Sequence, residues 1–198
     1  SLLLYDFYPD AESTTDIFCP PTLPALAALD AEIESIWLDN NGAIERDWLP
    51  FADLWNPIIA WDTRLLLAVR FSAGSASTGS ALVFATPPPG TTAHLLSAAV
   101  RLSLDDGRSV VTDARIVLAP EQGTPFSSPG AAALLRNHPP VPDQIEQAAH
   151  IALLDAQSHQ STPPPESAYR IDLAAHLTRQ ALDRALARAL RDPLIGRL

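Results

Sequence analysis

The chain has 198 residues, 47% of them hydrophobic and 18% charged, a balance typical of a folded protein with one ordinary domain or two small ones. A formal net charge of −10 argues against nucleic-acid binding, which needs a basic surface. All 13 basic residues are arginine, which excludes chemistry that requires a lysine amine, such as Schiff-base formation.

The first half of the chain predicts a short helix followed by a hairpin. Residues 24–31 favour a helix that begins at a proline. Residues 31–39 alternate between apolar and polar side chains, as in a half-buried strand, and the turn Asn40-Asn41-Gly42 leads into a hairpin partner at 43–49. A helical turn and a further strand are expected at 51–55 and 64–72.

The second half changes from strands to helices. Three strands are predicted at 81–85, 94–104 and 109–119, with the last two joined by a hairpin turn at Asp105-Asp106-Gly107. Three helices are predicted: 127–137 begins with serine and proline, and 142–157 and 168–190 carry small apolar residues at helical spacing. Strands that precede helices in this way are typical of the α+β class.

Motifs that carry chemistry are missing from the sequence. The five histidines have no metal-ligand spacing, and the single cysteine, Cys19, is expected to be a buried small residue. The chain contains no G-x-S-x-G nucleophile elbow and no glycine-dense phosphate loop. No apolar run approaches the roughly 20 residues that span a bilayer. We therefore predict no catalytic residue, no metal ligand and no membrane span.

Two groups of residues are candidates for an interface. Aromatic residues supply much of the apolar area of protein cores and interfaces, and arginines along an outer helix face suit either an acidic partner or solvent. Both interpretations of each group stay open. The groups are Trp37, Trp48, Trp55 and Trp61, and then Arg179, Arg184 and Arg188 of the last helix.

Several segments resemble the FAD-binding subunit, or domain, of the molybdenum hydroxylases, the group of xanthine dehydrogenase, aldehyde oxidoreductases and carbon monoxide dehydrogenase. The most specific are LSLDDGRSVVTDARIVLA, residues 102–119, and AYRIDLAAHLTRQAL, residues 168–182. PALAALDAEIESIWLDNNGAIERDWLPFADLW and DTRLLLAVRFS are weaker matches. The resemblance implies an α+β fold. Residues 1–62 would be a truncated remnant of the FAD-binding middle domain, and 63–198 a C-terminal domain with a small antiparallel sheet (64–119) on a three-helix bundle (128–192).

The chain departs from that family where relatives contact flavin. The resemblance places glycine-rich loops and flavin-facing charged residues at positions that here carry none of those residue types. The corresponding positions are Pro21, Ala85, Pro88, Pro89 and Thr92. Backbone donors for the pyrophosphate and cations near the isoalloxazine ring are thereby lost.

The resemblance and these departures together suggest a flavin-free structural or assembly subunit of a molybdenum hydroxylase complex, without an active site or cofactor of its own. Its expected partners are a large molybdopterin-binding subunit and a small iron–sulfur subunit, with a cytochrome subunit as a further candidate. Two alternatives stay open: the C-terminal half of a working FAD-binding subunit that passes electrons from iron–sulfur clusters to an acceptor, and an unrelated soluble binding module. The compartment, on the cytoplasmic or the periplasmic side of a bacterial membrane complex, is also left open.

Overall fold

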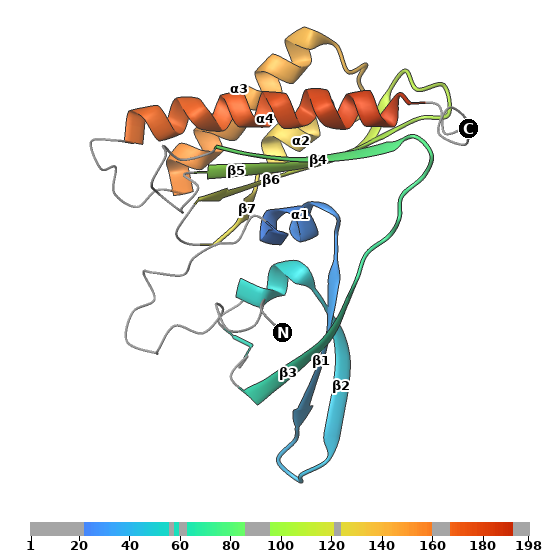
Figure 1. The fold of residues 1–198 in the computed structure, drawn as a ribbon, viewed down its shortest axis with the longest axis vertical. Coiled ribbons are helices and arrows are strands. Elements are labelled where there is room, and N and C mark those ends of the chain that lie inside the picture. Colours follow the sequence, from blue (N-terminus) through green and yellow to red (C-terminus); the bar gives the residue numbers. More distant parts are fainter. Residues whose placement is uncertain are drawn as a thin grey trace.

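The computed structural model describes residues 22–55, 58–59, 63–85, 96–120, 124–159 and 167–191. Figure 1 shows two sheets one below the other, with helices above the upper sheet and short helical segments, α1 among them, between the two. The upper sheet is antiparallel, in the strand order β4-β5-β6-β7. Its strands are β4 (Thr78–Phe84), β5 (Leu96–Leu104), β6 (Val111–Pro120) and β7 (Phe126–Ser127).

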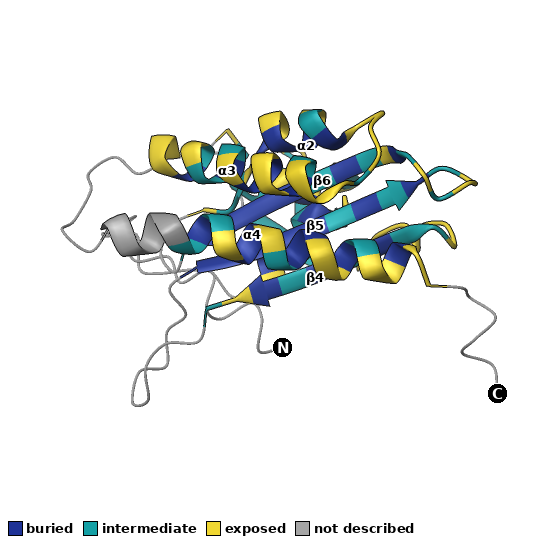
Figure 2. Ribbon diagram, turned by 90° about the horizontal axis from the view of Figure 1, so that it is seen from above, coloured by how far each residue is buried: buried dark blue, intermediate teal, exposed yellow. Residues whose placement is uncertain are grey.

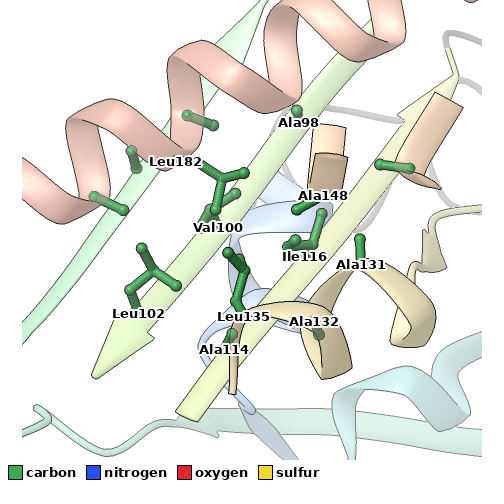
Figure 3. Packing of buried hydrophobic residues seen from close by; sticks show 14 of the residues in the cluster. Ala98, Val100, Leu102, Ala114, Ile116, Ala131, Ala132, Leu135, Ala148 and Leu182 are labelled. Atoms are coloured by element: carbon green, nitrogen blue, oxygen red, sulfur yellow. The ribbon is translucent and has the colours of Figure 1, made fainter. Parts of the chain in front are cut away.

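The main core lies between the upper sheet and helices α2 (Pro129–Leu135), α3 (Pro142–His159) and α4 (Ser167–Ala189). Because side chains alternate across a strand, every second residue of β5 enters this core. Val100 and Leu102 are 0% and 1% exposed and lie beside Leu182 of α4 (Figure 3). The buried stripes of the helices face the sheet and their exposed sides face solvent (Figure 2).

Small residues let α4 approach β4 very closely. Gly79 of β4 lies under the helix, and a Cβ at this position would stand 2.0 Å from the carbonyl oxygen of Ala185 and 2.6 Å from the backbone nitrogen of Ala189. The alanine-rich face of α4 therefore packs backbone against backbone at this point.

Helix α1 (Thr22–Ala28) covers the other face of the upper sheet. Ala28 packs on Ala99 of β5 and Val117 of β6, so β5 is buried on both faces. Just after the helix, Asp30 accepts two hydrogen bonds of 2.8 Å from the Arg115 guanidinium, in the bidentate geometry that favours arginine–carboxylate pairs. Apolar contacts and an ion pair together hold α1 to the sheet.

The lower sheet has three antiparallel strands in the order β2-β1-β3. They are β1 (Glu32–Leu38), β2 (Ile44–Pro50) and β3 (Arg64–Arg70), and a 3₁₀ turn, η2 (Phe51–Trp55), follows β2. The β1–β2 turn is held by Asp39, whose carboxylate accepts hydrogen bonds from the backbone N–H groups of Ala43 and Asn41 at 2.7 and 2.9 Å. These bonds hold the pKa of Asp39 below its ordinary value.

The predicted α+β class, both hairpins and all four helices are confirmed, with boundaries shifted by a few residues. The assignment of residues 64–72 to the helix-backed sheet is wrong, because β3 pairs with β1 and the helix-backed sheet begins at β4. Strand β7, only two residues long, was not predicted. The division of the chain between residues 62 and 63 stays a prediction.

Candidate interface: an apolar groove between α1 and β3

An open groove of about 510 Å³ lies between α1 and the lower sheet. Its lining is almost entirely apolar and comes from α1, β1, η2 and β3, together with Leu82 of β4. Residues that line it include Leu23, Leu26, Ile33, Phe51, Leu66 and Val69.

The floor of the groove is a small core of its own. Leu23, Ile33 and Phe51 are 2%, 1% and 4% exposed and pack together. The N–H of Phe51 donates to the carbonyl oxygen of Ala31 at 2.7 Å, which fixes η2 against the start of β1. The ring of Trp55 meets Phe51 edge-on, with 5.6 Å between ring centroids. The floor of the groove is therefore apolar and almost completely buried.

A polar cluster lies on the lower sheet beyond the groove. The Arg64 guanidinium stacks on Trp37, 3.7 Å from the ring centroid, and donates to Ser35 Oγ at 2.9 Å and to Asp47 Oδ1 at 3.2 Å. Ser35 also donates to Asp47 at 2.9 Å. Because Arg64 is engaged by an aromatic ring, a hydroxyl and a carboxylate, this cluster ties three strands together and leaves Arg64 poorly suited to bind an anion.

The opposite face of the lower sheet carries two ion pairs, Arg70–Glu32 and Arg46–Glu34, and an apolar tip. Arg70 pairs with Glu32 at 2.7 Å and stacks on Trp48 at 4.0 Å. The hydrogen bond from Arg70 holds the pKa of Glu32 below its ordinary value. Near the tip, Leu38 and Ile44 are paired across the strands and are 67% and 72% exposed.

The predicted tryptophan group does not form one patch. Trp37 and Trp48 lie on opposite faces of the lower sheet, since Trp37 shares a face with Ser35, whereas Trp48 pairs with Glu34. Trp55 belongs to η2, and Trp61 lies outside the described residues. Three separate environments replace the single surface that the sequence spacing suggested.

The arginines of α4 are partly engaged within the chain. Arg179 pairs with Glu146 of α3 at 2.5 Å, and Arg188 donates to the carbonyl oxygen of Ser80 in β4. Arg184 is exposed between them. Two of the three thus help to attach α4, and their role in an interface stays a prediction.

Only one of the five positions aligned with flavin contacts, Ala85, lies within the described residues; Pro21, Pro88, Pro89 and Thr92 lie outside them. The Ala85 N–H donates to the carbonyl oxygen of Leu96 at 3.0 Å, and its methyl group packs against the main core. Position 85 therefore has no charge and no spare amide to offer a flavin.

The described ranges also lack a cluster of three or more histidine, cysteine, aspartate or glutamate side chains suited to hold a metal ion. In that same part of the chain, no helix combines the length and the apolar character that crossing a membrane requires.

The groove was not anticipated from the sequence, although a signal is present. The segment Leu65–Phe71 carries apolar residues on both faces of β3, a pattern typical of a strand covered on both sides. In the structure Leu67 and Val69 are each 47% exposed. Strand β3 is therefore less covered than its apolar sequence favours.

Comparison with known protein families gives a match for the second half of the chain. Residues 92–185, from before β5 into α4, match the family model described as the CO dehydrogenase flavoprotein C-terminal domain. No curated protein sequence gives a match.

Solved structures share the fold at low identity. Cu,Mo-CO dehydrogenase in a cyanide-inactivated form has 20% identity and a TM-score of 0.65, over 84% of this chain and 56% of that chain. CO dehydrogenase from Hydrogenophaga pseudoflava, which lacks the Mo-pyranopterin moiety, has 22% identity and a TM-score of 0.65, over 83% and 56%. Quinoline 2-oxidoreductase from Pseudomonas putida 86 has 18% identity and a TM-score of 0.62, over 86% and 56%. This chain thus spans just over half the length of each.

The antiparallel sheet backed by three helices is therefore similar in fold to solved CO dehydrogenase and quinoline 2-oxidoreductase structures, and residues 92–185 match the CO dehydrogenase flavoprotein C-terminal domain model. The family match covers 94 of the 198 residues, just under half of the chain, and the solved structures share its fold. The resemblance to FAD-binding subunits that the sequence indicated is confirmed.

Proposed function

We propose that this protein is a flavin-free structural subunit that takes part in assembling a molybdenum hydroxylase complex. It would bind a large molybdopterin-binding subunit and a small iron–sulfur subunit, and electrons would leave the complex by another component such as a cytochrome subunit. The chain would contribute surface and rigidity but no catalytic group.

The observation that carries the proposal is the environment of Ala85. At a position where the resemblance places a charged residue towards the flavin, this chain has a methyl group packed on the main core and an amide already bonded to Leu96. A charge introduced there would have to leave the apolar core, so this position is suited to packing and not to cofactor binding. The chain also has no lysine at all with which to replace such a contact nearby.

Exposed apolar surface on the lower sheet supports a role in a heteromer. Large exposed apolar patches on soluble proteins mark interaction sites, because leaving them in water is unfavourable. The tip of the lower sheet presents Leu38, Ile44 and Leu65, which are 67%, 72% and 56% exposed. A partner subunit that covered this tip would gain roughly 25 cal/mol for each Å² of apolar surface removed from water.

Flavin content tests the proposal directly. The chain is co-purified with its partners, the complex is denatured, and the released flavin, molybdenum and iron are measured against each subunit. We expect molybdenum and iron in the complex and no flavin retained by this chain. Stoichiometric FAD bound to this chain would contradict the proposal, and so would recovery of the chain without any partner.

The second candidate function is that of the C-terminal half of a working FAD-binding subunit, which passes electrons from iron–sulfur clusters to an acceptor. The observation that favours it is the coverage, since the chain spans only 56% of its solved relatives. The intact mass of the native polypeptide separates the two functions. A mass well above that of these 198 residues, together with bound flavin, would select this second function.

A further inference from the structure

Three exposed arginines form a stripe at the C-terminal end of α4. Arg184, Arg188 and Arg191 follow one another at spacings of four and three residues, which place side chains on one face of a helix. Arg191 comes just after the helix, and its N–H donates to the carbonyl oxygen of Arg188 at 3.3 Å, so the last turn continues to this residue.

The stripe lies on the side of α4 that faces β4, the end strand of the upper sheet. The Arg188 guanidinium donates to the carbonyl oxygen of Ser80 in β4. Arg179, nine residues earlier and therefore on the opposite side of the helix, pairs with Glu146 of α3. Figure 2 shows α4 along the β4 side of the sheet and α3 on the other side. The stripe is thus turned away from the other helices.

A fourth arginine reaches the end of α4 from the β5–β6 turn. Arg108 Nη1 donates to the carbonyl oxygen of Leu190 at 3.0 Å. The backbone of Arg108 has a φ of 53°, in the left-handed region that is unfavourable for most residues other than glycine. The turn therefore holds a long cationic side chain beside the stripe, and the four residues together form an arginine cluster.

No carboxylate neutralises the arginine cluster within the described part of the chain. Arg108 and Arg188 donate to backbone carbonyl oxygens, which carry no net charge. Arg184 and Arg191 have no ion-pair partner among the described residues. Elsewhere in the described chain, arginines pair with carboxylates, namely Arg46, Arg64, Arg70, Arg115, Arg136 and Arg179. In a chain with a formal net charge of −10, this cluster is an exception.

The nearest carboxylates in the sequence have other positions or partners. Asp183 is four residues after Arg179 and therefore shares the face of Arg179, not that of the stripe. Asp105, in the same turn as Arg108, accepts hydrogen bonds from the N–H groups of Ser109 and Val110 at 2.7 and 2.8 Å. The positive charge of the cluster is therefore available to an outside anion.

We propose that the arginine cluster, Arg108, Arg184, Arg188 and Arg191, binds an acidic segment of a partner subunit. Guanidinium groups match carboxylates through paired hydrogen bonds, and each of these arginines keeps N–H donors that no described residue uses. A short acidic segment suits the site better than a nucleic acid or an anionic membrane, because the net negative chain repels an extended polyanion. The choice of a subunit as the source of the segment rests on the proposed function.

Binding of octaglutamate to the full chain tests the site by itself. Arg184→Gln/Arg191→Gln removes two positive charges from the cluster. Gln147→Glu/Gln157→Glu, at exposed positions of α3, lowers the net charge by the same two units and is the control. At about 50 mM salt we expect the affinity for octaglutamate to fall at least about tenfold in the first variant and to stay within about threefold of wild type in the second.

Thermal unfolding checks that both variants are folded. Equal affinities of the three proteins for octaglutamate would overturn the proposal, and so would a wild-type protein that does not bind the peptide. Binding to phosphatidylserine vesicles without binding to octaglutamate would assign the cluster to a membrane surface and would also contradict the proposal.

Carbodiimide cross-linking in the co-purified complex tests the partner. The sequence has no lysine, so Arg184→Lys keeps the charge and introduces the one side-chain amine of the chain. The carbodiimide activates a carboxylate of the partner, and the amine displaces it to form an amide while the carbodiimide leaves as a urea. We expect cross-links from position 184 to aspartate or glutamate of the partner, and none from the control Gln147→Lys on α3.

The outcomes separate this proposal from the proposed function. Equal cross-linking from both positions would overturn the proposal, as would no cross-link from position 184 while the partner still co-purifies. Recovery of the wild-type chain without any partner would contradict the proposed function and the source of the segment assigned here, whereas octaglutamate binding decides the site in either case.

Discussion

The two sheets of this protein are built from similar residues, but other elements of the chain cover their faces to different degrees. Strand β5 of the upper sheet is covered by α4 on one face and α1 on the other, and Ala98 and Val100 have no exposed surface. Strand β3 of the lower sheet is equally apolar, but Leu67 and Val69 remain almost half exposed. The upper sheet is therefore a self-sufficient core, whereas the lower sheet has an apolar face that the described residues do not cover.

The largest expected effect comes from truncating a side chain of the upper core. Leu182 of α4 is completely buried against the upper sheet (Figure 3). We expect Leu182→Ala to lower the free energy of unfolding by about 4 kcal/mol, through lost burial and the cavity left behind. Leu38→Ala, the matched change at the exposed tip of the lower sheet, should cost less than about 1 kcal/mol. Urea titrations measure both, and equal costs would abolish the contrast between the sheets.

The close approach of α4 to β4 gives the second prediction. Gly79→Ala would place a methyl group into the backbone of α4, which cannot move aside as a flexible side chain would. We expect a loss of about 3 kcal/mol, measured by thermal or urea unfolding. Gly107→Ala, in the β5–β6 turn, is the control, because a Cβ there meets its nearest atom only at 3.4 Å. A Gly79→Ala protein as stable as Gly107→Ala would show that α4 does not pack this tightly.

The polar cluster of the lower sheet gives a smaller effect. Arg64→Ala removes the stack on Trp37 and the hydrogen bonds to Ser35 and Asp47, and we expect a loss of about 1 kcal/mol. Arg64→Lys keeps the charge but loses the planar stacking surface, so its stability should fall between those of Arg64→Ala and wild type. If Arg64→Lys were as stable as wild type in urea titrations, the stack would contribute nothing.

The smallest effect concerns the two hairpin turns, one in each sheet, which use the same device. Asp105 accepts hydrogen bonds from the N–H groups of Val110 and Ser109, and these bonds hold the pKa of Asp105 below its ordinary value. In the other turn, the hydrogen bond from the N–H of Ala43 lowers the pKa of Asp39 in the same way. A lowered pKa in the folded state stabilises the protein above the unfolded-state pKa of about 3.9, and this stabilisation is lost as the pH falls through the folded-state pKa.

Unfolding measured from pH 6 down to pH 3 tests this dependence. Asp105→Asn and Asp39→Asn should be less stable than wild type at pH 6, and the difference should shrink towards pH 3. Asp106→Asn, a change of the exposed neighbour in the same turn, is the control and should follow the wild-type curve. A difference that stays constant with pH would refute the role of the two ionised carboxylates.

Local patterns determined much of this fold from the sequence alone. The turn residues at 40–42 and 105–107 fixed both hairpins, and the spacing of small apolar residues fixed α3 and α4, because each signal depends on neighbours along the chain. Only the tertiary structure decided which strands share a sheet, as the wrong assignment of residues 64–72 shows, because pairing depends on segments distant in sequence. It also separated the tryptophans onto different faces, paired Arg64, Arg70, Arg179 and Arg188 within the chain, and left the apolar β3 open beside a groove. A sequence records which side chains favour burial, but the packing of the whole chain decides which of them are covered.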